Sequence, residues 1–163
     1  MIRVASPQAQ KLQQPGLWDS TVHPRNVDAL KQLNRSLAYS QGQFCLILAH
    51  CDNPSIRQQM IQQLHDHCSV SLNEIVLDQS AETLYTTVYR EFQGKQPEAV
   101  MVTGLESVQR LSQLLIATNY VREEFCKFSF PIVLWVTDDV LKKLIRLVPD
   151  FFSWASAGIE FSE

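Results

Sequence analysis

Short apolar runs alternate along this chain with segments whose apolar residues recur every three or four positions. Apolar runs of strand length occupy residues 44–49, 99–103 and 131–136, and shorter ones occupy 74–77 and 158–161. Runs that are apolar at nearly every position are typical of strands covered on both faces. Helical spacing predicts helices over residues 26–40, 54–67 and 107–126. Two more are predicted, one capped by Asp78 or Ser80 and running to Phe92, and one from Asp138 or Asp139 to about residue 149.

Strands that alternate with helices indicate parallel pairing through right-handed crossovers. We therefore predict an α/β fold: three layers, with a mostly parallel five-stranded sheet and helices on both faces. The 163 residues suffice for one domain with its own core. Residues 1–24 are interpreted as an N-terminal tail, and residues 25–163 as a single domain.

Charge and composition narrow the classes of partner. The net charge of −3 argues against nucleic-acid binding through phosphate contacts. No apolar run approaches the roughly 20 residues of a membrane span, and the N-terminus lacks the apolar core of a signal peptide. The four cysteines show no paired spacing, which favours a reducing compartment. We expect a cytoplasmic protein that binds neither nucleic acid nor membrane.

Histidine and cysteine residues gather at two places, around His50-Cys51 and over residues 65–68. The first group ends a strand and the second ends the following helix, so a rise of 1.5 Å per residue separates them by about 20 Å. Neither group has the spacing of a zinc motif. Neighbours in sequence also do not make a catalytic dyad. We predict no metal site and no catalytic residues there.

The turn after the first long apolar run is His50-Cys51-Asp52-Asn53, and a helix follows directly. A strand, a turn and a helix in this order open a P-loop nucleotide-binding domain. Such a loop needs glycine backbones and a lysine to hold phosphates. Here no glycine occurs between Gly42 and Gly94, and no lysine between Lys31 and Lys95.

Several stretches together resemble a known family. They comprise Cys51-Asp52-Asn53-Pro54 with Ile56-Arg57, and residues 119–125, 130–137, 149–154 and 158–161. Over roughly residues 26–162 the chain is similar to the AAA-like, STAND-type P-loop NTPase domains of large bacterial signalling proteins. The resemblance implies a sheet order of 5-1-4-3-2, with strands counted along the predicted domain.

The resemblance also assigns positions. The degenerate nucleotide loop would comprise His50, Cys51, Asp52 and Asn53, with Arg57 one turn into the helix. Glu106 falls at the Walker B-like position and Thr137 at the sensor-like position. Asp52 or Asn53 is expected to cap the helix and satisfy the N–H groups that would otherwise hold a phosphate, while Pro54 has no N–H to offer. The sequence thus predicts no bound ATP or Mg²⁺.

Two function classes remain open. The first is a non-catalytic P-loop-like module, a pseudo-NTPase with a protein partner, a neighbouring domain or a second copy; Trp18, Phe152 and Trp154 would form its partner surface, or pack internally. The second is a divergent NTPase that uses Arg57, Glu106 and Thr137. A receiver domain fits poorly, because no aspartate follows the third strand and no lysine follows the fifth. Cys51 at a helix N-terminus could also have a lowered pKa and be sensitive to oxidation.

Overall fold

The computed structural model describes residues 2–4, 18–156 and 158–163. The strands are β1 (Ile2–Val4), β2 (Cys45–His50), β3 (Leu72–Val76), β4 (Ala99–Thr103), β5 (Pro131–Val136) and β6 (Ile159–Glu160). The α-helices are α2 (Pro24–Tyr39), α3 (Pro54–His67), α4 (Leu84–Phe92), α5 (Leu111–Tyr120), α6 (Asp138–Leu147) and α7 (Pro149–Ser153). Two 3-10 segments, η1 (Leu105–Ser107) and η2 (Arg122–Lys127), flank α5.

The strands of the described residues form one sheet with the order β1-β3-β4-β5-β2-β6. The five strands from β2 to β6 are parallel, and their order matches the predicted 5-1-4-3-2. Strand β1 adds an antiparallel edge, with Ile2 opposite Ile75 and Val4 opposite Asn73. The interpretation of residues 1–24 as a tail missed this strand, because three residues are too few to show a strand period.

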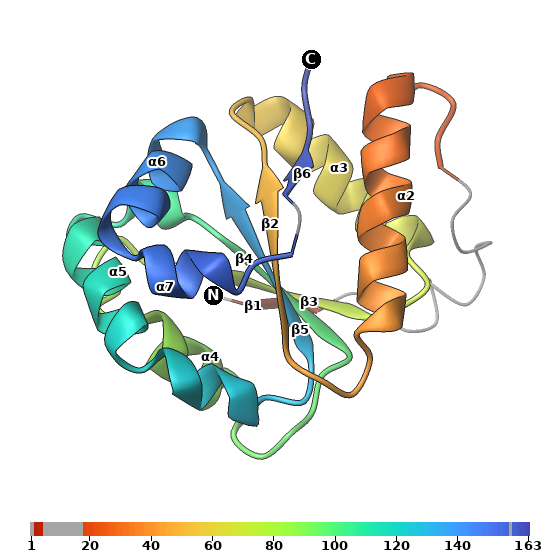
Figure 1. Cartoon of the computed structure of the whole chain (residues 1–163). Coiled ribbons are helices and arrows are strands. Elements are labelled where there is room, and N and C mark those ends of the chain that lie inside the picture. Colours follow the sequence, from red (N-terminus) through yellow and green to blue (C-terminus); the bar gives the residue numbers. More distant parts are fainter. Residues whose placement is uncertain (1, 5–17, 157) are drawn as a thin grey trace.

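Helices cover both faces of the sheet, as predicted (Figure 1). Helices α2 and α3 pack on one face, against residues such as Ile47, Met101 and Trp135. Helices α4, α5, α6 and α7 pack on the other, against Leu48, Leu134 and their neighbours. Successive strand residues point to opposite faces, so strands that are apolar throughout serve both cores. Strand β5 is buried at every position.

The segment predicted as one helix over 107–126 is helical as α5 only from Leu111 to Tyr120; η1 ends at Ser107, and η2 begins at Arg122. Gly104 precedes η1 with φ of +92°, and a Cβ there would lie 3.2 Å from the backbone oxygen of Leu77. Glycine is therefore required at this turn. The helix for which Asp78 or Ser80 was the predicted cap begins at Leu84. Asp78 instead accepts hydrogen bonds from the N–H and hydroxyl of Ser80 and forms a turn.

Among the described residues, none of the helices has both the length and the apolar character to cross a bilayer.

Candidate functional site

The turn after β2 lies at the carboxyl end of the parallel strands, which is where ligands bind in open α/β sheets. His50 ends β2, and the Cys51 N–H donates to the carbonyl of Val136 at 2.9 Å. Asp52 and Asn53 complete the turn before Pro54 begins α3. The structure thus places the predicted nucleotide-loop residues together at this edge of the sheet.

Asn53 is the residue that caps α3. Its Oδ1 accepts hydrogen bonds from the N–H groups of Ser55 at 2.8 Å and Ile56 at 3.1 Å. Its Nδ2 donates to Oε1 of Glu163. Because Pro54 has no N–H, the donors at the start of this helix that could hold an anion are already bonded to a side chain of the chain itself.

Asp52 and Thr137 serve the neighbouring helix. Oδ1 of Asp52 accepts a hydrogen bond from the N–H of Asp138 at 2.6 Å, and the hydroxyl oxygen of Thr137 accepts one from Val140 N–H at 3.3 Å. Both therefore stabilise the N-terminus of α6. Lys142 lies 2.8 Å from the Asp138 carboxylate, and its hydrogen bond lowers the pKa of that carboxyl group. The Thr137 hydroxyl, predicted at a sensor-like position, is thus used as a helix cap.

Arg57 and Glu106 form an ion pair between α3 and η1. Nη1 of Arg57 lies 2.6 Å from Oε1 of Glu106, and the two side chains are 17% and 27% exposed. They line a polar hollow of about 400 Å³ together with Gln58, Thr103 and Ser107. The charges of Glu106, which was predicted at a Walker B-like position, and of Arg57 on α3 thus neutralise each other.

His50 lies between two carboxylates without a hydrogen bond to either. Its Nε2 is 3.7 Å from Oδ1 of Asp52, and its Nδ1 is 3.9 Å from Oε1 of Glu160. Nε2 is buried and has no hydrogen-bond partner among the described residues. Within the same residues, no group of three or more His, Cys, Asp or Glu side chains is arranged to hold a metal ion.

Cys51 contradicts the hypothesis of a lowered thiol pKa. The side chain is buried, and its Sγ donates to the carbonyl oxygen of Asn53 at 3.4 Å. Burial raises the pKa of the Cys51 thiol, and the hydrogen bond with the Asn53 backbone and the nearby Arg57 guanidinium offset this only in part. Loss of hydration of the thiolate therefore outweighs these two favourable contacts.

The three aromatic residues proposed for a partner surface lie in different places. Trp18 packs edge-on against His67 with ring centroids 6.1 Å apart and contacts the core under α2 and α3. Trp18 therefore docks on its own chain. Phe152 and Trp154 are half-buried at the end of α7, and Phe152 lines an apolar hollow beside α6.

Sequence reasoning missed further exposed apolar side chains on this face. Ile116 on α5 is 51% exposed, Tyr120 is 87% exposed, and Ile145 on α6 is 49% exposed. Their positions in the sequence could have indicated this exposure, because each residue lies outside the stripe of its helix that faces the core. The pattern showed which residues were inward but did not show how much apolar surface was left outside.

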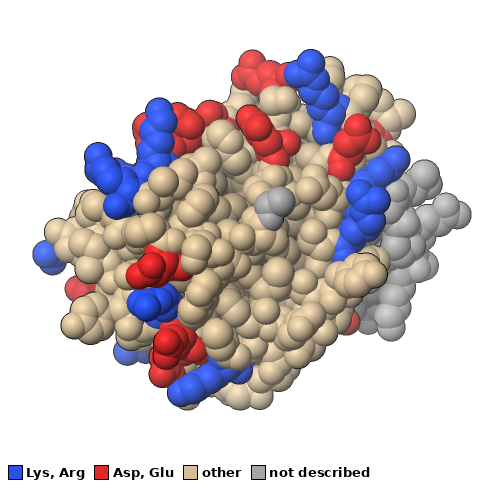
Figure 2. Space-filling model, in the orientation of Figure 1, with Lys and Arg blue, Asp and Glu red and all other residues tan. Residues whose placement is uncertain are grey.

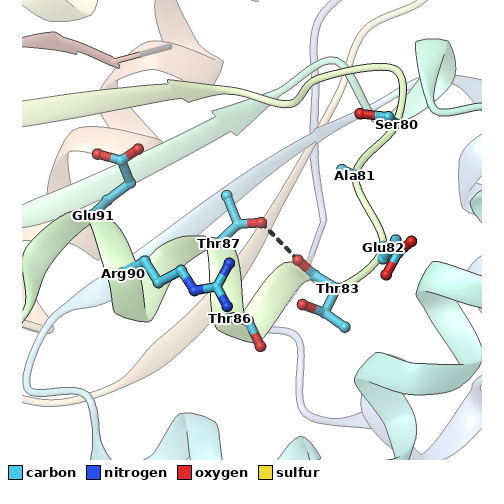
Figure 3. A pocket seen from close by; sticks show the side chains of 8 residues that line it. All are labelled: Ser80, Ala81, Glu82, Thr83, Thr86, Thr87, Arg90 and Glu91. Carbon is cyan, nitrogen blue, oxygen red and sulfur yellow. Dashed lines mark hydrogen bonds between the residues drawn. The ribbon is translucent and has the colours of Figure 1, made fainter.

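Another hollow, which the sequence did not predict, lies along α4 (Figure 3). It measures about 530 Å³, and hydroxyl and charged groups dominate its lining, which includes Ser80, Glu82, Thr83, Thr86, Thr87 and Arg90. The Thr87 hydroxyl donates to the carbonyl of Thr83 at 2.7 Å and so belongs to the helix (Figure 3). The lining carries charges of both signs, so its charge does not select a ligand.

Comparisons with known proteins give a fold neighbour. No protein-family description matches the sequence, and no curated protein matches it. Among solved structures, the chain is similar to Hsp104 of S. cerevisiae, an AAA+ ATPase, in its extended complex with casein. The TM-score is 0.56 at 14% identity over 99% of this chain, which spans 30% of the Hsp104 chain. The fold is P-loop NTPase-like.

Proposed function

We propose that this chain is a P-loop-like module of the AAA-like, STAND type that has lost nucleotide hydrolysis and acts through protein contacts. The observation that carries the proposal is the Asn53 cap: its carboxamide occupies the N–H groups of Ser55 and Ile56. In P-loop domains the corresponding N–H groups and a lysine cradle the phosphates. Here the neutral Asn53 side chain accepts the hydrogen bonds that a phosphate would accept, and the lysine is missing.

The electrostatics of the sheet edge support the same function. Asp52, Glu106, Asp138 and Glu160 all lie near the carboxyl ends of the strands, and Arg57 is already paired with Glu106. A triphosphate placed there would meet several carboxylates and no unpaired lysine. The chain would then act as a regulatory module in a signalling or scaffolding assembly and contact a neighbouring domain, a partner protein or another copy. Such a role requires the α/β fold but not nucleotide hydrolysis.

Isothermal titration with ATP and Mg²⁺, together with a phosphate-release assay, tests the proposal. We expect neither saturable heat in the micromolar range nor phosphate release. Micromolar binding, or turnover that disappears in Glu106→Gln, would contradict the proposal and support the divergent NTPase instead.

One observation favours residual nucleotide binding as the second candidate. The polar hollow beside Arg57 is large enough for a small ligand, and a phosphate could compete with Glu106 for the guanidinium. Under this alternative, Glu106→Gln raises the affinity for ATP, because it frees Arg57. Under the proposed function, the same variant still fails to bind.

A further inference from the structure

Residues 161–163 follow β6 and lie beside the turn that precedes α3. These three consecutive residues bond to three different parts of the protein: the end of β2, helix α2 and the cap of α3. The first bond is donated by the N–H of Phe161 to the carbonyl of His50 at 2.9 Å. Figure 1 shows the segment beside α2 and α3. We call residues 161–163 the strap, because they join these elements.

Asn26 on α2 fastens the strap. Its Oδ1 accepts a hydrogen bond from the N–H of Ser162 at 3.0 Å, and its Nδ2 donates to the carbonyl of Ser162 at 2.7 Å. Asn26 is only 2% exposed, and a buried carboxamide without partners would be costly. Both ends of this carboxamide are therefore used to hold the backbone of one residue of the strap.

The strap has a buried start and an exposed end. Phe161 is 3% exposed, and its ring centroid lies 5.2 Å from that of Trp135 in the core. Glu163 is exposed, and its carboxylate accepts a hydrogen bond from Nδ2 of Asn53. The strap thus runs from the core to the side chain that caps α3.

The contact with Glu163 determines which way the Asn53 carboxamide faces. A carboxamide carries an acceptor oxygen on one side and a donor NH₂ group on the other. With Nδ2 directed at Glu163, Oδ1 accepts from the N–H groups of Ser55 and Ile56. In the opposite orientation donors would face donors, and the cap would be lost. The strap therefore orients the cap of α3.

The end of the strap lies at the surface. Figure 2, in the orientation of Figure 1, shows charged side chains of both signs at the upper margin of the molecule, where Figure 1 marks the C-terminal end. Glu160 and Glu163 are exposed in this part of the chain. A partner can therefore contact this segment without entering the core.

We propose that the strap is a conformational device that keeps the Asn53 cap in place, and that Asn26 is the residue that fastens it. When Asn26 releases the strap, Glu163 moves away and Asn53 loses the contact that orients it. A protein that binds residues 161–163 would in this way loosen the turn before α3, which is a coupling between two places on the chain. The coupling involves no nucleotide, so it does not depend on the proposed function.

Backbone amide hydrogen exchange of the whole chain tests the coupling. In Asn26→Ala, the amides of Ser55 and Ile56 should exchange about fivefold faster than in the parent, because they lose a capping acceptor. Amides inside α3, such as those of Met60 and Leu64, should change by less than about twofold.

Two variants of Glu163 act on the exposed end of the strap, where a substitution leaves the core intact. Glu163→Ala removes the acceptor of Asn53 Nδ2 and should accelerate exchange at Ser55 and Ile56 as Asn26→Ala does. Glu163→Gln keeps an acceptor oxygen and should exchange as the parent does. These variants test the proposal even if Asn26→Ala fails to fold.

Asn34→Ala is the matched control on the same helix. Oδ1 of Asn34 accepts hydrogen bonds from Sγ of Cys68 at 3.0 Å and from the N–H of Ser69 at 2.9 Å, at the other end of α3. This variant also removes an asparagine that bonds another segment to α2, but it does not touch the strap. Exchange at Ser55 and Ile56 should stay within about twofold of the parent.

Two results would overturn the inference. Unchanged exchange at Ser55 and Ile56 in Glu163→Ala, or in a folded Asn26→Ala, would show that the cap does not depend on the strap. Equal acceleration along the whole of α3, or the same acceleration in Asn34→Ala, would indicate a general loss of stability. The ATP titration is a separate measurement, so failure of the proposed function is detected independently.

Discussion

The polar hollow beside α3 and the apolar hollow beside α6 have similar volumes, about 400 Å³ and about 370 Å³. They differ in whether other groups of the chain contact the side chains that line them. In the polar hollow, Arg57 and Glu106 pair with each other, and the nearby helix donors bond to Asn53. In the apolar hollow, Ile145 stays half exposed. The contrast teaches that the polar groups at this edge of the sheet are bonded to one another, while the surface left without cover is mainly apolar.

The largest expected effect is at the floor of the apolar hollow. Leu48→Ala should lower the free energy of unfolding by about 3 kcal/mol, because it removes a buried side chain and enlarges an existing cavity. Urea unfolding measures the change. Leu141→Ala, at a half-buried position on the wall of the same hollow, is the control and should cost clearly less. Equal losses of unfolding free energy in the two variants would mean that Leu48 does not form the buried floor of the hollow.

A smaller effect is expected at the cap of α3. Asn53→Ala should destabilise the protein by about 1 kcal/mol, because Ser55 and Ile56 lose their acceptor. Thr137→Ala should cost less, since its single hydrogen bond is longer, at 3.3 Å, and Asp52 also caps α6. Thermal unfolding of the two variants compares them. A larger loss with Thr137→Ala would show that the two caps are ranked wrongly.

The Arg57–Glu106 pair is expected to contribute still less. A double-mutant cycle with Arg57→Met and Glu106→Gln should give a coupling energy of about 0.5 kcal/mol, which is usual for a partly exposed ion pair. About 1 M NaCl should reduce the coupling, since salt screens exposed charges. If the cycle gives no coupling at low salt, the two groups do not hold α3 and η1 together.

The last prediction concerns the reactivity of the cysteine thiols and not the stability of the protein. Burial raises the pKa of Cys51, so at about pH 8 this thiol has a smaller thiolate fraction than an ordinary cysteine. Iodoacetamide should label the exposed Cys126 first. Cys51 should react only when the pH rises further or the protein unfolds. Mass spectrometry of the labelled peptides checks the order, and early labelling of Cys51 would restore the redox hypothesis.

Much of the fold could be predicted from local pattern. The runs 99–103 and 131–136 became β4 and β5 with the expected bounds, because strands buried on both faces must be apolar throughout. The order of the strands followed from the resemblance and not from the pattern. Boundaries were weakest where single residues decide them, as at Gly104 and Asp78, whose turns depend on φ and on side-chain hydrogen bonds.

The sequence indicated which residues follow β2 at the sheet edge, but it did not indicate their hydrogen-bond partners. The absence of glycine and lysine in the turn is a property of the sequence. That Asn53 rather than Asp52 caps α3, and that Asp52 reaches Asp138, required the backbone geometry. The Arg57–Glu106 pair joins residues 49 positions apart, a distance over which local pattern carries no information.

The sequence alone determined the strand and helix periods, the apolar strands and the missing phosphate-binding residues, because each of these is carried by near neighbours in the chain. Tertiary structure alone decided which side chains neutralise each other at the sheet edge and where apolar surface remains open. These features depend on segments that strand pairing and helix packing bring together. Contacts between distant segments determine the burial of each side chain, and burial determines the strength of its charge interactions and hydrogen bonds.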